Sequence, residues 1–231
     1  RTLLSPYRDS LPKEIFNQTY APPTANGSGR LRGNLRTARK LLAQAGWRIK
    51  NMQLVHDRGG EPFRFEIMLV RRSNEKLALH LARNLAKLGI EVSVRTVDTA
   101  QYQQRTNTFD FDAIFHTWEP SLSPGNEQAF YWGSEAARQP GSRNYPGIRV
   151  PAVDALIQKI SDAPDRASLV TAVRAMDRIL QWGHYVIPLF HLKADRVALW
   201  DKFGRPEQMP LYGYRLETWW ADASRMEGNR K

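Results

Sequence analysis

Between residues 118 and 145 the chain gathers aromatic and polar side chains whose types suit the binding of a small organic molecule. The aromatic members are Trp118, Phe130, Tyr131, Trp132 and Tyr145. The polar members are Glu119, Asn126, Glu127, Arg143 and Asn144. Aromatic walls with a few placed polar groups are the usual lining of an organic-ligand pocket. A carboxylate holds an ammonium group and an arginine holds a carboxylate through two hydrogen bonds, so a zwitterionic peptide would suit both.

A purely structural interpretation is open for the same residues, in which the rings belong to the core and the charges are solvated. Their place in the chain favours a ligand. The apolar run Phe111–Thr117, a predicted strand, leads into the segment, and Pro151 is expected in the first turn of the helix that follows it. Because ligand sites in α/β proteins tend to lie beyond the carboxyl end of a strand, we predict a binding loop here.

The motifs that would indicate a reaction are missing from the sequence. The chain has no cysteine, none of its five histidines occurs as His-x-x-x-His, and no phosphate-loop, Gly-x-Gly-x-x-Gly or Gly-x-Ser-x-Gly pattern is present. Asp110 and Asp112 share one face of a predicted strand, whereas a catalytic pair would flank a bond from opposite sides; we interpret them as strand-edge residues. We therefore predict a protein that is not an enzyme, with no catalytic residue, metal site or cofactor.

Helical and strand periods alternate from Asn34 to Trp118. The predicted helices are Asn34–Ala45, Asn74–Leu88 and Thr99–Thr106, and the predicted strands are Phe63–Val70, Ile90–Arg95 and Phe111–Thr117. This alternation predicts an α/β fold with helices packed on a sheet. Further along, helices are expected from Pro151 and after Asp165, strands at Tyr185–Phe190 and Arg196–Trp200, and mostly loop beyond them.

The composition allows one large domain or two small ones in 231 residues, with 42% hydrophobic residues to build a core. No run approaches the ~20 apolar residues that span a bilayer. The net charge of +11 allows an alternative function, a module that binds nucleic acid or an anionic surface. The basic stripe Arg32, Arg36, Arg39 and Lys40 would serve it. That stripe has no interleaved aromatic residue for stacking on bases, and it is equally an ordinary solvated helix face.

Motifs spread over nearly the whole chain form a recognisable set. They are Phe109-Asp-Phe-Asp-Ala-Ile-Phe115 with Trp118, Ser121-Leu-Ser-Pro-Gly-Asn-Glu127, Tyr131-Trp132-Gly-Ser134, Gly141-Ser-Arg-Asn144 and Pro151-x-Val-Asp-x-Leu-Ile157, with Leu35-x-x-Ala-x-x-Leu-Leu-x-x-Ala-Gly-Trp47, Arg95-Thr-Val-Asp98-x-Ala-Gln-Tyr102, Trp182-Gly-His-Tyr-Val186 and Trp200-Asp-Lys-Phe-Gly-Arg-Pro206. Together they resemble the family 5 extracellular solute-binding proteins, the periplasmic peptide-binding components of ABC transporters, in particular the oligopeptide and microcin C type.

The resemblance implies a periplasmic-binding-protein-like fold (type II, cluster C), in which two lobes, each a mixed sheet flanked by helices, close on a ligand. Members are about twice this length, so we expect a C-terminal part: residues 1–183 as most of the second lobe, and residues 184–231 as strands and a tail that complete the first. The implied partners are a peptide or modified peptide, the missing N-terminal lobe and a membrane permease, which is the only link to the membrane; nucleic acid is not among them. The implied location is the periplasm of a Gram-negative bacterium, although this chain shows no signal peptide.

The site differs from the family pattern at one point. Many members hold the amino terminus of the peptide with an aspartate just after the tryptophan that matches Trp118, where this chain has Glu119-Pro-Ser-Leu122. We therefore expect a modified or differently anchored peptide. The predicted ligand-binding residues are Trp118, Glu119, Ser121, Asn126, Glu127, Trp132, Arg143, Asn144 and Tyr145.

Overall fold

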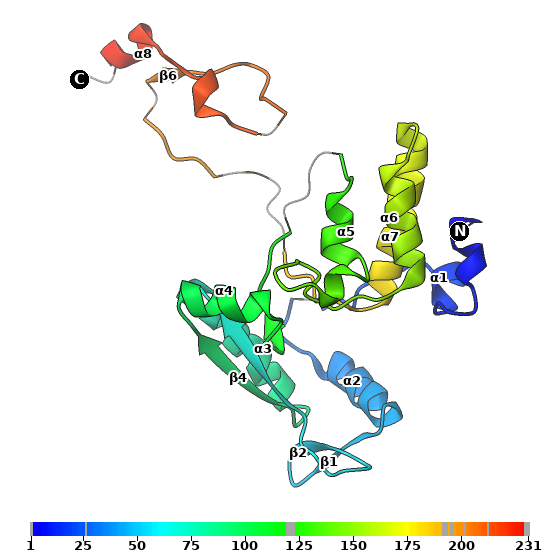
Figure 1. Ribbon diagram of the computed structural model, residues 1–231. Coiled ribbons are helices and arrows are strands. Elements are labelled where there is room, and N and C mark those ends of the chain that lie inside the picture. Colours follow the sequence, from blue (N-terminus) through cyan, green and yellow to red (C-terminus); the bar gives the residue numbers. More distant parts are fainter. Residues whose placement is uncertain are drawn as a thin grey trace. The chain divides into compact units, whose positions relative to one another are not determined.

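The computed structural model describes residues 2–25, 27–118, 123–190, 194, 196–200, 202–211 and 213–228. The chain forms two compact units, Arg1–Val186 and Ile187–Lys231 (Figure 1). The break lies close to the predicted boundary at residues 183 and 184. The assignment of the two parts to the lobes of a larger protein stays a prediction.

Three parallel strands form a sheet in the first unit, in the order β4-β3-β5. They are β3 (Arg64–Leu69), β4 (Glu91–Thr96) and β5 (Ala113–Ile114). The short 3-10 turn η2 (Arg72–Asn74) and the helix α3 (Glu75–Ala86) connect β3 to β4, and α4 (Thr99–Asn107) connects β4 to β5. Parallel neighbours require crossover connections of this kind. The α/β class that the alternating periods predict is therefore confirmed.

The helix α3 packs on the sheet. Its Ala78 is completely buried among Ile67 and Leu69 of β3, with Val92 and Val94 of β4 beside them. Small and branched side chains thus fill the space between helix and sheet, which contributes roughly 0.8 kcal/mol for each buried CH₂ group. This packing fixes the sheet whose β5 edge leads to the candidate site.

The strand β5 is shorter than the predicted strand Phe111–Thr117. Only Ala113 and Ile114 pair with β3. Just before them, the Asp112 carboxylate accepts the backbone N–H of Glu66 on β3 at 2.9 Å. A side chain thus accepts a hydrogen bond that a backbone carbonyl would accept in a longer strand. Asp110 lies outside the strand and pairs with Arg105 of α4 at 3.1 Å. Both aspartates thus lie just before β5, at the edge of the strand as interpreted, and each fastens the turn that enters it.

A β-hairpin that the sequence did not reveal precedes the sheet. Strands β1 (Trp47–Lys50) and β2 (Gln53–His56) pair antiparallel, and the turn residues Asn51 and Met52 have positive φ angles of 49° and 64°. Such turns usually contain glycine, which is why this one gave no signal. The helix α2 (Arg32–Gln44) packs against the hairpin and α3 through Leu35, Ala38 and Leu42, which confirms the predicted amphipathic helix.

Gly89 ends the α3 segment in the left-handed conformation, with φ at 78°. The N–H of Leu54 donates to the Gly89 carbonyl at 2.7 Å. A Cβ atom at this position would lie 2.7 Å from the Leu54 nitrogen, so the hairpin approaches too closely for any other residue.

Helices and 3-10 turns form the second core of the first unit. They are η1 (Thr2–Tyr7), α1 (Glu14–Asn17), α5 (Glu127–Trp132), η3 (Ala136–Arg138), α6 (Pro151–Ser161) and α7 (Arg166–Trp182). As predicted, Pro151 opens α6, and Asp165 caps α7 by accepting the Ser168 N–H at 2.7 Å. The core also includes Leu4 of η1 and Ile15 of α1, from the amino-terminal region.

The second unit has little regular structure. Its elements are β6 (Phe203–Gly204), β7 (Trp220–Ala221), η4 (Leu216–Thr218) and α8 (Ala223–Gly228). The predicted strands at 185–190 and 196–200 are wrong for the residues described there. Ile187, Phe190 and Trp200 expose 73%, 78% and 77% of their surface. The two segments have the apolar composition of strands, but their described residues pair with no other strand.

Candidate ligand-binding site

A cleft of about 440 Å³ lies beyond the carboxyl end of β5. Its described lining includes Tyr102 and Asn107 of α4, His116 after β5, Phe130 of α5, and Arg143 and Tyr145. We call it the α4 cleft. A cleft at this edge of a parallel sheet is the expected place for a ligand in α/β proteins.

The loop that carries Arg143 is fastened between two helices. The Gly141 N–H donates to the carbonyl of Asn107 on α4 at 2.8 Å, and the Arg143 N–H donates to the carbonyl of Phe130 on α5 at 3.3 Å. We call residues 141–148 the anchor loop. The helix α4 is itself set by Asp98, whose carboxylate accepts the Gln101 N–H at 2.8 Å and caps its first turn.

Asn144 holds the anchor loop from inside. Its side chain is completely buried, and its amide donates to the carbonyls of Gly133 at 2.8 Å and Ile148 at 2.9 Å. Its Oδ1 accepts the Ile148 N–H at 2.9 Å. With these bonds made inside the fold, Asn144 positions its neighbours and has no free face for a ligand.

Four aromatic rings form a row, and two of them, His116 and Tyr145, line the cleft. The Trp132 and Trp118 rings lie 5.0 Å apart, Trp118 meets His116 edge-on at 4.7 Å, and His116 meets Tyr145 edge-on at 4.7 Å. The structure therefore brings together three of the predicted residues, Trp118, Trp132 and Tyr145. It joins them through His116, which the prediction missed. A single histidine at the end of an apolar strand has no spacing pattern that would have marked it.

Two buried nitrogen atoms in this row have no hydrogen-bond partner in the described part of the chain. They are Nε2 of His116 and Nε1 of Trp118. Buried polar groups are nearly always satisfied, and an unsatisfied one costs about 1–3 kcal/mol. Functional sites are one of the places where such a cost is found.

Burial dominates the electrostatics of the cleft. It lowers the pKa of His116 from its ordinary value, and the nearby Arg143 charge lowers this pKa further, so the ring is neutral at pH 7. Burial also raises the pKa of Tyr145, against a smaller opposite effect of Arg143. Burial raises the pKa of Tyr102, and its charge interaction with the Tyr145 hydroxyl raises this pKa further; the Tyr102 hydroxyl donates to the Phe115 carbonyl at 3.1 Å. The tyrosines therefore remain hydrogen-bond donors over the physiological range.

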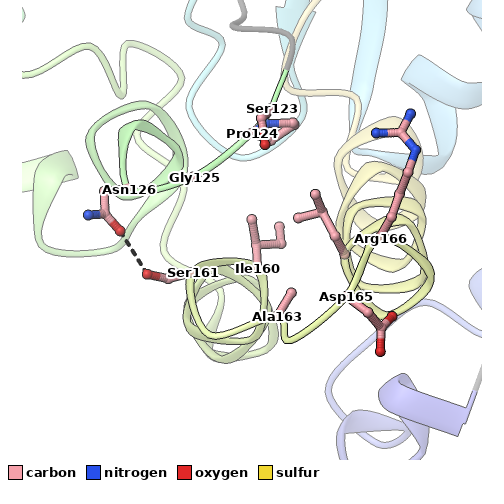
Figure 2. Close-up of a pocket in the computed structure, with 10 residues that line it drawn as sticks. Ser123, Pro124, Gly125, Asn126, Ile160, Ser161, Ala163, Asp165 and Arg166 are labelled. Atoms are coloured by element: carbon pink, nitrogen blue, oxygen red, sulfur yellow. Dashed lines mark hydrogen bonds between the residues drawn. The ribbon is translucent and has the colours of Figure 1, made fainter.

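The remaining predicted residues lie elsewhere. Asn126 lines a second hollow of about 460 Å³ between the start of α5, the end of α6 and the start of α7. Figure 2 shows its side chain facing Ser161, whose hydroxyl donates to Oδ1 at 2.7 Å. The Glu127 carboxylate accepts the Gly125 N–H at 3.0 Å and thus shapes the turn before α5. Glu119 and Ser121 lie outside the described residues.

Groups of three or more potential metal ligands are not found within the described ranges. Similarly, none of the helices described there is long and apolar enough to cross a membrane.

Residues 5–139 match the family model of the bacterial extracellular solute-binding proteins, family 5 (middle). The chain belongs to this family. The membership confirms the family that the motifs of the sequence predicted.

Relatives of the family 5 chain are longer than it is. The probable peptide-binding protein YejA of Agrobacterium fabrum is 40% identical over 220 residues, which are 95% of this chain and 36% of that protein. The peptidoglycan-binding protein YepA of the same organism is 39% identical over 218 residues, which are 94% of this chain and 35% of that protein. The chain thus spans little more than a third of the length of these curated relatives.

A solved structure shares the fold of the family 5 chain. The oligopeptide-binding protein AppA of Bacillus subtilis, solved in complex with a nonapeptide, has a TM-score of 0.63 and 19% identity, over 95% of this chain and 44% of that chain. The predicted type II periplasmic-binding-protein fold, with a sheet flanked by helices, is therefore confirmed.

Proposed function

We propose that the chain forms one wall of the ligand cleft in an extracytoplasmic binding protein, which captures peptides or modified peptides and delivers them to the permease of an ABC importer. The α4 cleft carries this proposal, because an aromatic row with polar groups at the carboxyl edge of a parallel sheet suits an organic ligand. The family description supports binding over catalysis, and a periplasmic location.

The names of similar proteins support peptide-containing ligands. One relative is described as peptide-binding, another as peptidoglycan-binding, and AppA was solved with a nonapeptide. Peptides and peptide-bearing cell-wall fragments share amide groups, carboxylates and apolar side chains. The rings of Trp118, Trp132 and Tyr145 would accept the apolar parts, and Arg143 a polar end.

The transport mechanism would be closure of two lobes. A ligand that touches both walls shifts the equilibrium toward the closed form, because it binds that form more tightly than the open one. The opposite wall would come from the remainder of the protein, since relatives are nearly three times as long as their match to this chain. Glu119 and Ser121 remain proposed contacts.

The experiment is titration calorimetry with the protein encoded by the complete reading frame, using peptides of about three to nine residues and a peptidoglycan-derived peptide. Tyr145→Ala should weaken binding by about 5- to 100-fold, as loss of a central aromatic contact does. Tyr20→Ala is the matched control, because Tyr20 is also half-buried but packs on Trp182, away from the described cleft lining. Equal effects of the two variants, with both folds intact by circular dichroism, would refute the site; no binding of any peptide would refute the function.

A further inference from the structure

The α4 cleft contains a positive charge that no other described residue of its lining balances. Arg143 is the one permanent cation among its described lining residues, and none of these residues carries a carboxylate. The exposed Arg143 side chain makes no ion pair or hydrogen bond with the rest of the described chain. By contrast, Arg105 of α4 donates to Glu66 at 2.9 Å and to Asp110 at 3.1 Å. An arginine held at a cleft without a partner is ready to receive an anion.

Hydrogen-bond donors lie around Arg143. The Tyr145 hydroxyl stays protonated because burial raises its pKa, and it makes no hydrogen bond with another described residue. Asn107 also lines the cleft, and its Oδ1 already accepts from Gln103 Nε2 at 2.7 Å, which leaves its amide N–H groups for other partners. A carboxylate has about four acceptor positions and no donor, and it matches such a set.

We propose that the α4 cleft is a carboxylate subsite, in which Arg143 grips the acid group through two hydrogen bonds while Tyr145 and Asn107 donate from the sides. The inference rests on the proposed function, because it names the part of the ligand that this wall receives. The carboxylate comes either from the carboxyl terminus of a peptide or from an acidic side chain. Both have the same chemistry, so the experiment has to separate them.

His116 would report on the occupied subsite. Its described charged or titratable neighbours are Arg143 and Tyr145 of the anchor loop and Tyr102 of α4, with the uncharged Trp118 ring at its edge. A bound carboxylate would offset the Arg143 charge that now helps to lower the pKa of His116. This pKa should rise when the site is filled and fall back when it is empty.

The test compares three peptides by titration calorimetry with the protein from the complete reading frame: trialanine, trialanine amide, and the amide of Ala-Glu-Ala. We expect at least one acid-bearing peptide to bind about 10-fold or more tightly than trialanine amide, as for hydrogen bonds to charged groups. Arg143→Met should abolish this preference and Arg143→Lys should keep part of it. Arg149→Met, at an exposed arginine just after the anchor loop and outside the cleft lining, should keep all of it. Which acid-bearing peptide is favoured identifies the source of the carboxylate.

A second arm uses small probes, so that failure of peptide binding does not leave the subsite undecided. The pKa of His116 is followed by NMR with N-acetylglycine and with its neutral amide. A rise with the acid alone, lost in Arg143→Met, supports the subsite even if no peptide binds and the proposed function fails. No rise in the wild-type protein, or a peptide preference that survives in Arg143→Met, would overturn the inference.

Discussion

Replacing Asn144 with alanine should lower the free energy of unfolding by about 3–5 kcal/mol. The side chain is completely buried and serves three backbone groups, the carbonyls of Gly133 and Ile148 and the N–H of Ile148. Each group left without a partner costs about 1–3 kcal/mol, and entry of water would relieve part of the sum. The anchor loop would loosen as a result, so ligand affinity should fall together with stability.

Urea unfolding, followed by circular dichroism, measures this effect. Asn126→Ala is the matched control, because its exposed side chain shares one hydrogen bond with Ser161, and the loss should stay within about 0.5–1 kcal/mol. Asn144→Asp is a sharper variant. It keeps the shape but replaces two N–H donors with a buried negative charge facing carbonyls, which raises the pKa of the new carboxyl. Its stability should therefore be better at low pH and fall as pH rises through that pKa. Less than about 1 kcal/mol lost in Asn144→Ala would refute the reasoning.

Three further predictions concern the frame of the site. Gly89→Ala should lower the free energy of unfolding by about 2–4 kcal/mol, because φ is positive there and a Cβ would lie 2.7 Å from the backbone. Gly33→Ala, in open space on α2, is the control and should be neutral or stabilising. Similar urea midpoints for the two variants would count against the close approach. Asp98→Ala should cost about 1 kcal/mol by removing the cap of α4, and an unchanged midpoint would contradict that role. Because the pKa of His116 is lowered on folding, its contribution to stability is present above about pH 6.5 and is lost as pH falls toward the folded-state pKa. His116→Phe should therefore flatten the dependence of the unfolding free energy on pH in this range. Identical slopes of this dependence in the two proteins would disprove the prediction.

The regular elements with strong periods could be predicted from the sequence. In α3 and β4 the apolar spacing repeats over several turns or alternations, and local pattern and tertiary burial agree. The segments 185–190 and 196–200 are equally apolar but have no strand beside them, because strand formation depends on a partner that composition does not specify. The β1–β2 hairpin was missed for the opposite reason, since its pairing is real but its Asn51–Met52 turn lacks glycine.

The candidate site was predicted in its chemistry more than in its geometry. Aromatic side chains at 118, 132 and 145 indicated a pocket, and they do meet. The polar residues could not be sorted from sequence, because an asparagine that binds a ligand and one that binds backbone look alike. Asn144 proved to be the second kind, and only its burial reveals this. The net charge of the chain likewise could not single out Arg143 among the basic residues. Its role follows from the described cleft lining, in which no residue carries a carboxylate.

The anchor loop alternates along its length between inside and outside. Ser142 and Asn144 are buried to 1% and 0% exposure, while Arg143 between them is exposed and Tyr145 is half-buried. The residues that shape the loop are thus separate from those that face the cleft. Positions 143 and 145 are therefore free to diverge among related proteins without loss of the backbone path. A new ligand preference could evolve, or be engineered, by changing these two side chains on an unaltered support.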